Sequence, residues 1–188
     1  MGSRLSGNIG LGTRLFMEWK SKPFMIIIIQ ARSNSKRFPG KIYQKVNGKP
    51  LIEYAIDAAK ETKINFCVVI PKGDLKLIEY LETRQILYFE GSELDVLDRF
   101  YQYVQYSEHS PIIRLCADTL YDKEDILEQI KLYQKRNKFT YGNGVYICSF
   151  SELKDAWANA KGNHREHVTT YLYRSIDYPE DIEKWQKE

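Results

Sequence analysis

The segment MIIIIQARSNSKRFPGK, residues 25–41, joins the most hydrophobic run of the chain to a basic loop. The apolar run from Met25 to Ile29 has the length of a buried strand and is far shorter than the roughly 20 residues of a membrane helix. Like charges repel one another, so a loop that concentrates them indicates an anion as the ligand. Four cations lie within ten positions of this loop: Arg32, Lys36, Arg37 and Lys41.

Short β-branched runs alternate with longer segments of helical period along the chain. This alternation predicts an α/β fold with a mostly parallel sheet and helices on both faces. In such sheets ligands bind outside the carboxyl ends of the strands, where the basic loop begins. We expect strands at 26–29, 66–70, 86–89, 112–115 and 145–148, and helices at 51–59, 75–83, 96–106, 126–136, 151–160, 165–174 and 179–186. The expected N-caps of the second, third and fourth helices are Asp74, Ser92 and Asp122.

The length of 188 residues and 43% hydrophobic content suit one domain, which we place at 25–188. Residues 1–24, rich in Gly and Ser, are interpreted as a flexible or partly vector-derived extension. The net charge of +3 is small and argues against a nucleic-acid-binding surface. The three cysteines lack C-x-x-C spacing, which indicates free thiols in a reducing compartment. With no apolar run of membrane length, we expect a cytoplasmic protein without a membrane partner.

The loop residues suit phosphate in particular. Two residues separate Arg32 from the predicted strand, and its planar fork matches two phosphate oxygens, whereas Lys41 offers a point charge. The backbone amides of Ser33, Asn34 and Ser35 are further candidate donors. The chain has no G-x-x-x-x-G-K-[ST] sequence, which excludes a P-loop. An ordinary solvated basic loop remains the alternative interpretation.

Four stretches resemble the sugar-activating cytidylyltransferases, a family that includes the CMP-Kdo and CMP-sialic acid synthetases and the SpsF-type polysaccharide enzymes. IIQARSNSKRFPGK at 28–41 and NGKPLI at 47–52 are similar to the family signature "I-Q-A-R-x-x-S-x-R-[LF]-P-G-K" and "G-G-K-P-L-[LI]". EGSELDVLDRF at 90–100 and REHVT at 165–169 resemble the SpsF-type motifs "G-S-E-D-D-V-L-D-R-[FY]" and "R-E-H-V-T".

The resemblance implies a Rossmann-like, GT-A-type nucleotidyltransferase fold. It implies that CTP binds, that a hydroxyl of an acidic or related sugar attacks the α-phosphate, and that pyrophosphate leaves. Such chemistry needs positioning and charge neutralisation more than a covalent nucleophile. The implied catalytic residues are Arg32, Lys41 and Asp118, and the implied sugar-side residues are Arg165 and Glu166. The implied nucleotide-binding residues are Gln30, Ala31, Arg32, Ser33, Ser35, Arg37, Lys41 and Ser92. Relatives are often dimers, so a homodimer is a further expectation.

The resemblance also implies Mg²⁺, which takes oxygen ligands and usually only one or two protein carboxylates. Its implied ligands are Asp118, after the predicted strand at 112–115, and Asp177, in SIDYPEDIE at 175–183. Two alternatives stay open. Asp118 would serve equally as a cap or turn former, and Asp177 as an ordinary helix start.

Two segments depart from the family pattern. CADT at 116–119 keeps the aspartate of the family's "G-D-C-P" and lacks its glycine and proline, and GNGVY at 142–146 lacks both acids of "G-L-D-V-E". These departures motivate a rival hypothesis, a non-catalytic nucleotide-binding or scaffold homologue. A second rival keeps the fold and changes the base or acceptor, as in uridylyl-, guanylyl- or methylerythritol-phosphate cytidylyltransferases. The sequence does not name the acceptor sugar.

Overall fold

The computed structural model describes residues 25–35, 37–106, 109–166 and 168–172. The predicted extension at 1–24, the predicted helix at 179–186 and Asp177 lie outside these residues. No helix within the described ranges is both long and apolar enough to cross a membrane. Cys67, Cys116 and Cys148 are free thiols, as predicted.

A six-stranded sheet in the order β5-β4-β1-β6-β8-β7 forms the centre of the fold. Strands β5, β4, β1 and β6 are parallel, whereas β8 runs antiparallel to β6, and β7 runs antiparallel to β8. This confirms the predicted mostly parallel sheet. The strands span Ile26–Gln30 (β1), Phe66–Pro71 (β4), Tyr88–Gly91 (β5), Ile112–Cys116 (β6), Thr140–Gly142 (β7) and Val145–Cys148 (β8). A short hairpin, β2 (Lys45–Val46) with β3 (Lys49–Pro50), stands apart from the sheet.

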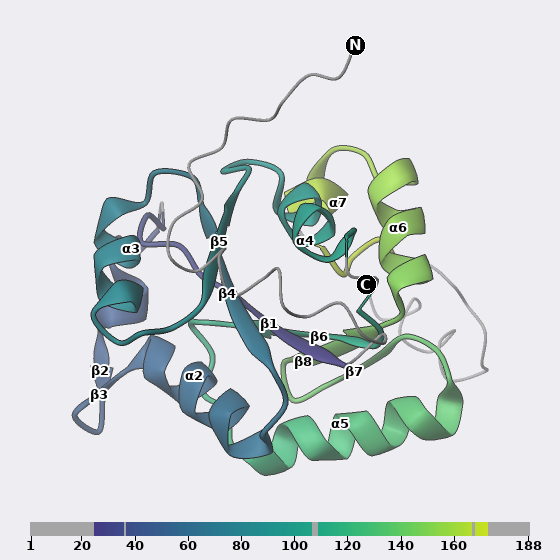
Figure 1. Ribbon diagram of the computed structural model, residues 1–188, viewed down its shortest axis with the longest axis horizontal. Coiled ribbons are helices and arrows are strands. Elements are labelled where there is room, and N and C mark those ends of the chain that lie inside the picture. Colours follow the sequence, from purple (N-terminus) through teal and green to yellow (C-terminus); the bar gives the residue numbers. More distant parts are fainter. Residues whose placement is uncertain (1–24, 36, 107–108, 167, 173–188) are drawn as a thin grey trace.

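Helices cover both faces of this sheet, as predicted (Figure 1). One face carries α2 and α5, and the other carries α4, α6 and α7. The helices span Leu51–Thr62 (α2), Leu75–Glu82 (α3), Val96–Val104 (α4), Lys123–Arg136 (α5), Phe150–Asn159 (α6) and Asn163–Glu166 (α7), and a 3₁₀ turn, η2, spans Lys41–Tyr43.

Strand β1 is buried on both faces because it lies between β4 and β6 and under both helix layers. Ile27 and Ile29 pack with α2 and α5, while Ile26 and Ile28 pack with α4 and α6. All four isoleucines are at most 2% exposed. Each such burial stabilises the fold by about 1.5–3 kcal/mol, which explains the continuous apolar run in the sequence.

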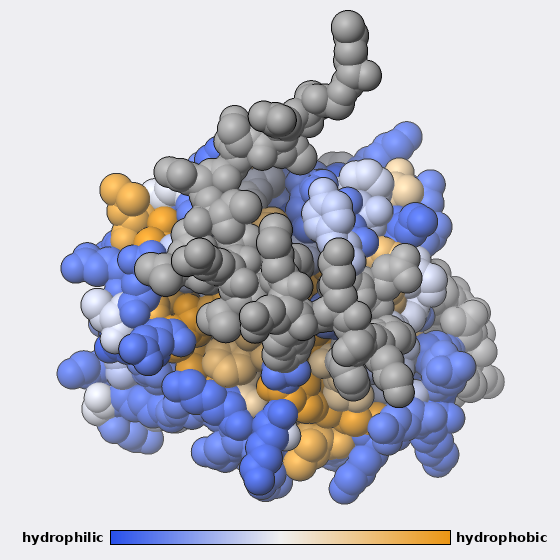
Figure 2. Space-filling model, in the orientation of Figure 1, coloured by the Kyte–Doolittle hydropathy of each residue, from blue (hydrophilic) through white to orange (hydrophobic). Residues whose placement is uncertain are grey.

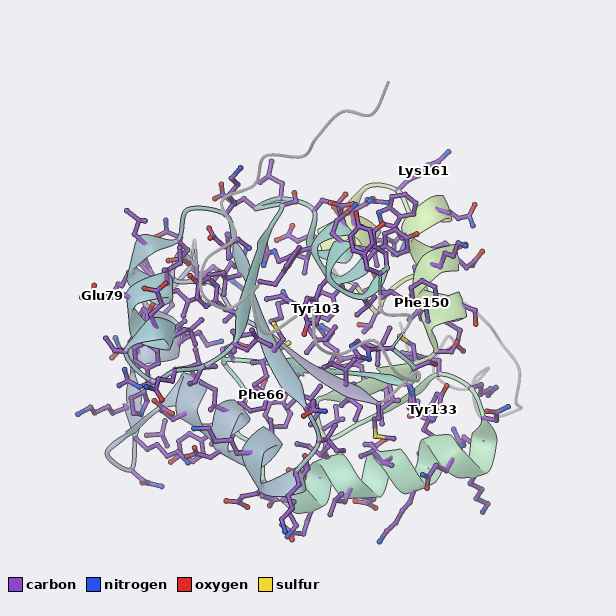
Figure 3. All side chains as sticks on the ribbon, viewed as in Figure 1. Phe66, Glu79, Tyr103, Tyr133, Phe150 and Lys161 are labelled. Atoms are coloured by element: carbon purple, nitrogen blue, oxygen red, sulfur yellow. The ribbon has the colours of Figure 1, made fainter. Side chains whose placement is uncertain are left out.

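The side chains divide between these two layers and the solvent (Figure 3). Phe66 and Tyr133 belong to the core beside α2 and α5, and Tyr103 and Phe150 to the core beside α4 and α6. Glu79 points outward at the rim. In the space-filling view, hydrophilic residues dominate the rim of this face, and hydrophobic residues gather toward its middle (Figure 2).

Among the predicted elements and caps, one strand, one cap and one helix differ most from the structure. The strand expected at 86–89 is β5, Tyr88–Gly91, because Ile86 instead donates its N–H to Leu81 and closes the end of α3. The N-cap of α4 is Asp95 rather than Ser92. The helix expected at 165–174 is confirmed only at 165–166, because α7 spans Asn163–Glu166 and 168–171 form turns.

Two Asn-Gly pairs make the tight turns of the two antiparallel hairpins. Asn47 and Gly48 join β2 to β3 with φ of 51° and 79°, and Asn143 and Gly144 join β7 to β8 with φ of 50° and 75°. Positive φ at both turn residues is the geometry of the type I′ hairpin, which glycine adopts without steric cost. A Cβ at Gly144 would come within 3.3 Å of Thr119 and of the Tyr121 hydroxyl, whereas nothing lies within 4 Å at Gly48.

These two turns form a matched pair for substitution. Gly48→Ala is expected to lower the free energy of unfolding by about 1–2 kcal/mol, because only the left-handed backbone is strained. Gly144→Ala adds the crowding against Thr119 and Tyr121 and should lower it by about 1 kcal/mol more. Urea unfolding of both variants measures the difference. Equal losses would show that the β7–β8 turn does not press on the residues after β6.

Candidate active site

A lysine and an aspartate from distant parts of the sequence meet at the carboxyl edge of the sheet. Lys41 opens the 3₁₀ turn that follows the loop after β1, and Asp118 lies two residues beyond the end of β6. The Lys41 Nζ and the Asp118 Oδ2 are 2.7 Å apart. Strands β1 and β6 are neighbours, and the strands that follow them in the chain lie on opposite sides of this pair, β4 beside β1 and β7 and β8 beyond β6. Parallel sheets bind ligands at such switch points.

The loop after β1 is held by hydrogen bonds of its own. The Ser33 N–H donates to Asp74 Oδ2 at 2.8 Å, and the Ser33 carbonyl accepts from the Gly40 N–H at 2.9 Å. The Ser33 hydroxyl lies 2.7 Å from the Tyr43 hydroxyl. The Ser33 amide, expected as a donor for an anion, is therefore already used by a carboxylate. The two other predicted loop residues lie in the same segment, Ser35 half-buried and Arg37 exposed.

Asp74 connects this loop to α3. Its Oδ1 accepts the Leu77 N–H at 3.3 Å as the N-cap of α3, as predicted, while its Oδ2 takes the Ser33 amide. Burial raises the pKa of the nearby Tyr43 hydroxyl, and the negative charge of Asp74 adds to this increase. The phenol therefore stays protonated at neutral pH, and either hydroxyl of the Ser33 and Tyr43 pair can donate to the other.

Arg32 is only loosely paired, and its charge acts on a second cation, Arg99. Its Nη1 lies 3.8 Å from the Glu166 Oε1, and the two side chains are 46% and 53% exposed. Arg99 nearby is 1% exposed, and burial, together with the charge of Arg32, lowers its pKa to about 10. Arg99 remains charged at neutral pH, so two guanidinium groups share one corner of the site. An anion there would relieve their repulsion.

The loop after β5 carries Ser92 and is fixed from α4. The Ser92 carbonyl accepts from both Nε and Nη2 of Arg99, at 2.8 and 2.5 Å. The Ser92 hydroxyl accepts the Asp95 N–H at 3.0 Å. Asp95 caps α4 by accepting the Asp98 N–H at 2.8 Å. Ser92 thus stabilises the turn before the cap, and its hydroxyl is engaged within the protein.

Arg165 links α7 to this same loop through hydrogen bonds. Its Nε donates to Asp95 Oδ2 at 2.6 Å, and its Nη1 donates to the Trp157 carbonyl at 2.5 Å. The Trp157 indole N–H in turn donates to Asp98 at 2.8 Å. Of the two predicted sugar-side residues, Arg165 is therefore occupied inside the protein. Glu166 is exposed and faces Arg32 instead.

The end of β1 and the end of β6 are joined through backbone and side chain. The Ala31 N–H donates to Val69, and the Gln30 carbonyl accepts the Ala117 N–H at 2.9 Å. These bonds occupy the backbone groups of Gln30 and Ala31, so the Gln30 side chain is the polar group that remains at the end of β1. Its Oε1 accepts from Nε and Nη2 of Arg114, at 3.1 and 2.9 Å.

The turn that carries Asp118 is held without the glycine and proline that the family pattern places there. The Thr119 N–H donates to the Cys116 carbonyl, which closes the turn. The Tyr121 hydroxyl accepts the Cys116 N–H and donates to the Gly144 carbonyl, both at 3.0 Å. Asp118 is thereby kept at the end of β6 and exposed.

A divalent metal would find one carboxylate at this place. No group of three His, Cys, Asp or Glu side chains that could hold a metal ion occurs among the described residues. Mg²⁺ often uses one or two protein carboxylates and takes its remaining oxygens from water and substrate phosphates. The Asp118 carboxylate, 41% exposed at the sheet edge, fits that requirement. Asp177, the second predicted ligand, lies outside the described residues.

Sequence reasoning missed three residues that build this region: Asp74, Asp95 and Arg114. Asp74 was recognised as a cap but not as the partner of the β1 loop, because that contact joins residues 41 positions apart. Asp95 was missed because Ser92, three residues earlier, was predicted as the N-cap of the same helix. Arg114 had a visible signal, since it is the single charged residue in the otherwise apolar strand IIRLC.

The two ion pairs of α7 should differ in strength. Arg165 and Asp95 are 27% and 29% exposed and hydrogen-bonded, so a double-mutant cycle with Arg165→Met and Asp95→Asn is expected to give a coupling of about 1–2 kcal/mol. The half-exposed pair of Arg32 and Glu166 should give less than about 0.5 kcal/mol. Urea unfolding of each set measures both couplings. A weaker coupling for Arg165 and Asp95 than for the exposed pair would contradict the role of Arg165 as a tie.

Comparison with known proteins supplies the context for this geometry. An uncharacterized protein of Methanocaldococcus jannaschii is 32% identical over 164 residues, which cover 80% of this chain and 68% of that protein. The spore coat polysaccharide biosynthesis protein SpsF of Bacillus subtilis is 30% identical over 166 residues, covering 79% of this chain and 69% of SpsF.

Solved structures show the same fold. A cytidylyltransferase from Leptospira borgpetersenii aligns with a TM-score of 0.69 at 23% identity, over 79% of this chain and 70% of that chain. The CMP:2-keto-3-deoxy-manno-octonic acid synthetase complexed with CTP aligns with a TM-score of 0.63 at 13% identity, over 80% and 84%. A protein from Mycobacterium tuberculosis in complex with manganese aligns with a TM-score of 0.58 at 11% identity, over 83% and 85%.

The cytidylyltransferase family model matches residues 26–183, which include every strand of the sheet and both residues of the Lys41 and Asp118 pair. The chain therefore belongs to the cytidylyltransferase family of nucleotidyltransferase enzymes.

Proposed function

We propose that this protein transfers CMP from CTP to a hydroxyl group of an acidic or related sugar, with Mg²⁺, in the synthesis of a cell-surface glycan. The single observation that carries the proposal is the contact of 2.7 Å between Lys41 and Asp118. It brings a cation for phosphate and a carboxylate for a metal to one point, at the switch between β1 and β6. Membership of the cytidylyltransferase family supports CMP as the transferred group, and the similarity to SpsF supports a role in glycan synthesis.

In the proposed reaction, the acceptor oxygen forms a bond to the α-phosphorus of CTP. The bond from that phosphorus to the bridging oxygen breaks, and pyrophosphate leaves with the electron pair. The proton of the acceptor hydroxyl passes to solvent. Because charge accumulates on the phosphate oxygens, positioned cations lower the barrier, and no covalent nucleophile from the protein is needed.

Lys41 and Arg32 would supply those cations. The Lys41 ammonium is 37% exposed and reaches the carboxyl edge of β6, so phosphate oxygens can approach it there. Arg32 is held only by the exposed Glu166 at 3.8 Å, a pair that contributes little in solvent. A triphosphate would therefore replace Glu166 on Arg32 at small cost and would reduce the repulsion between Arg32 and the buried Arg99.

Asp118 would hold the metal, which when bound neutralises phosphate charge and orients the triphosphate. The carboxylate is exposed, stands at the end of β6 and has a lysine rather than a second acid beside it. Lys41 balances the carboxylate charge in the free protein, and the phosphates of a bound nucleotide would offer it a new partner. Asp177, which lies outside the described residues, is proposed as the second ligand.

Pyrophosphate release tests the proposed function. The protein is incubated with CTP, Mg²⁺ and each member of a panel of acidic and neutral sugars. Release that depends on both CTP and an acidic sugar supports the proposal. CTP binding without release for any acceptor would favour the non-catalytic homologue, and failure to bind CTP would refute the proposal. Ranking CTP, UTP, GTP and ATP by thermal shift separates the cytidylyl activity from transfer of another nucleotide.

Asp118→Asn is expected to lower kcat by at least about a hundredfold and to leave CTP affinity within a few fold, because the amide is a poor metal ligand. Pyrophosphate release and isothermal titration measure the two quantities. Asp57→Asn is the matched control, since Asp57 also pairs with a lysine, Lys49, at 2.6 Å and with 39% exposure. An unchanged kcat in the Asp118 variant would remove this residue from the reaction.

Lys41→Gln is expected to weaken CTP binding by about tenfold or more, because a charge-assisted contact to phosphate is lost. The loss should shrink as salt is raised, since exposed charges are screened. Lys49→Gln is the control, as Lys49 is similarly exposed at 35% and lies on β3. Equal effects of the two substitutions would argue that Lys41 contributes only to the general positive field.

A further inference from the structure

Strand β6 carries a charge where a buried strand should carry none. Ile112, Ile113 and Leu115 are at most 1% exposed, while Arg114 between them is half-buried. Ile113 and Leu115 pack toward α2 and α5, so Arg114 points to the opposite face, the one that α4 and α6 cover. Removing a cation from water is costly unless it is paired or used, so its presence needs a reason.

The contacts of Arg114 fix its guanidinium but do not neutralise it. Two of its five N–H donors share one acceptor, the Gln30 Oε1, and its Cζ lies 4.8 Å from the centre of the Tyr146 ring. Tyr146 is itself stacked on Tyr141, at 4.4 Å between ring centres. Arg32, Arg84 and Arg165 each pair with a carboxylate, whereas no described carboxylate forms an ion pair with Arg114.

The guanidinium lies at the carboxyl edge of the sheet. Its partner Gln30 is the last residue of β1 and stands opposite Cys116, the last residue of β6. Burial raises the pKa of the Cys116 thiol, and the charges of Arg114, Asp118 and Lys41 all act on the same group. Arg114 therefore belongs to the neighbourhood of the Lys41 and Asp118 pair.

Arg114 and the loop after β5 lie on opposite sides of β1 in the strand order. That loop, with Ser92, lies on the β4 and β5 side of β1, while Arg114 and Tyr146 lie on the β6 and β8 side. Lys41 and Asp118 stand between them, at the ends of β1 and β6. If the phosphates lie at Lys41, the two flanks would hold the two parts that the reaction joins, the nucleoside on one side and the acceptor on the other.

We propose that Arg114, backed by the Tyr146 ring and oriented by Gln30, binds an oxyanion of the acceptor, a carboxylate or a phosphate. The inference rests on the proposed function, because it assigns the acceptor end of the same site. A guanidinium fixed by stacking and by two hydrogen bonds still offers a planar fork of donors, the geometry that suits a carboxylate or phosphate. Arg114 thus selects anionic acceptors over neutral ones.

The test measures acceptor binding separately from nucleotide binding. A non-hydrolysable α,β-methylene analogue of CTP is titrated first. Four probes then follow: 2-keto-3-deoxy-manno-octonic acid, N-acetylneuraminic acid, mannose 6-phosphate and neutral mannose. The variants are Arg114→Gln and Arg114→Lys. Arg84→Gln is the matched control, because Arg84 also stacks on a tyrosine, at 3.7 Å over Tyr80, but lies beyond the end of α3.

Wild type and Arg84→Gln are expected to bind at least one anionic probe. Arg114→Gln should weaken that probe by about ten- to a hundredfold, the loss of a charge-assisted hydrogen bond, and Arg114→Lys should fall between. Analogue affinity should stay within a few fold, and mannose binding should not change. Carboxylate and phosphate probes distinguish the two sources of the oxyanion. Unfolding midpoints confirm that each variant is folded.

Three outcomes overturn the inference: wild type binds no anionic probe, Arg114→Gln binds the probe as wild type does, or Arg114→Gln weakens the CTP analogue as much as the acceptor. The last would mean that Arg114 serves the nucleotide through Gln30. Failure of the proposed function looks different, since wild type would then not bind the analogue at all. In that case the probes are titrated into the nucleotide-free protein. Comparing wild type with Arg114→Gln then still shows whether binding of the anionic probes depends on Arg114.

Discussion

The burial of β1 between β4 and β6 is the constraint on which the rest of the structure depends. Four consecutive isoleucines can be removed from water only if both sheet faces are covered, and α2 and α5 on one side and α4 and α6 on the other provide that cover. A strand fixed in this way ends at a defined point. The loop that follows is therefore held at the carboxyl edge of the sheet, and Lys41 is brought to Asp118 of the neighbouring strand.

The cations at this edge of the sheet differ in how firmly the protein holds them. Arg99 and Arg165 are held by several hydrogen bonds and act as structural ties. Arg32 and Lys41 have one exposed acidic partner each. The difference follows from solvent, because an exposed ion pair contributes little and can exchange its partner for a phosphate, whereas a buried cation cannot leave its acceptors without a large loss. Arg32 and Lys41 can therefore exchange their acidic partners for phosphate at little cost.

Much of the fold followed from local patterns. The positions of β1, β4, β6 and β8 matched the apolar runs, and Asp74 and Asp122 cap their helices as expected, since these features depend on neighbours in sequence. The prediction was weaker where distant contacts decide. Strand β7 has only three residues and forms because β8 lies beside it. Helix α7 stops at Glu166, where the sequence predicted a longer helix.

The sequence by itself determined that a buried strand delivers cations to an edge and, through its motifs, which family the chain belongs to. It did so because a buried strand and a phosphate-binding loop each consist of contiguous residues, whose pattern is visible in the sequence. Only the tertiary structure decided how the charges are used. In the structure Arg165 donates to Asp95, the Ser33 amide donates to Asp74, and Arg114 donates to Gln30. Each of these contacts joins residues at least 41 positions apart, so no local pattern records them.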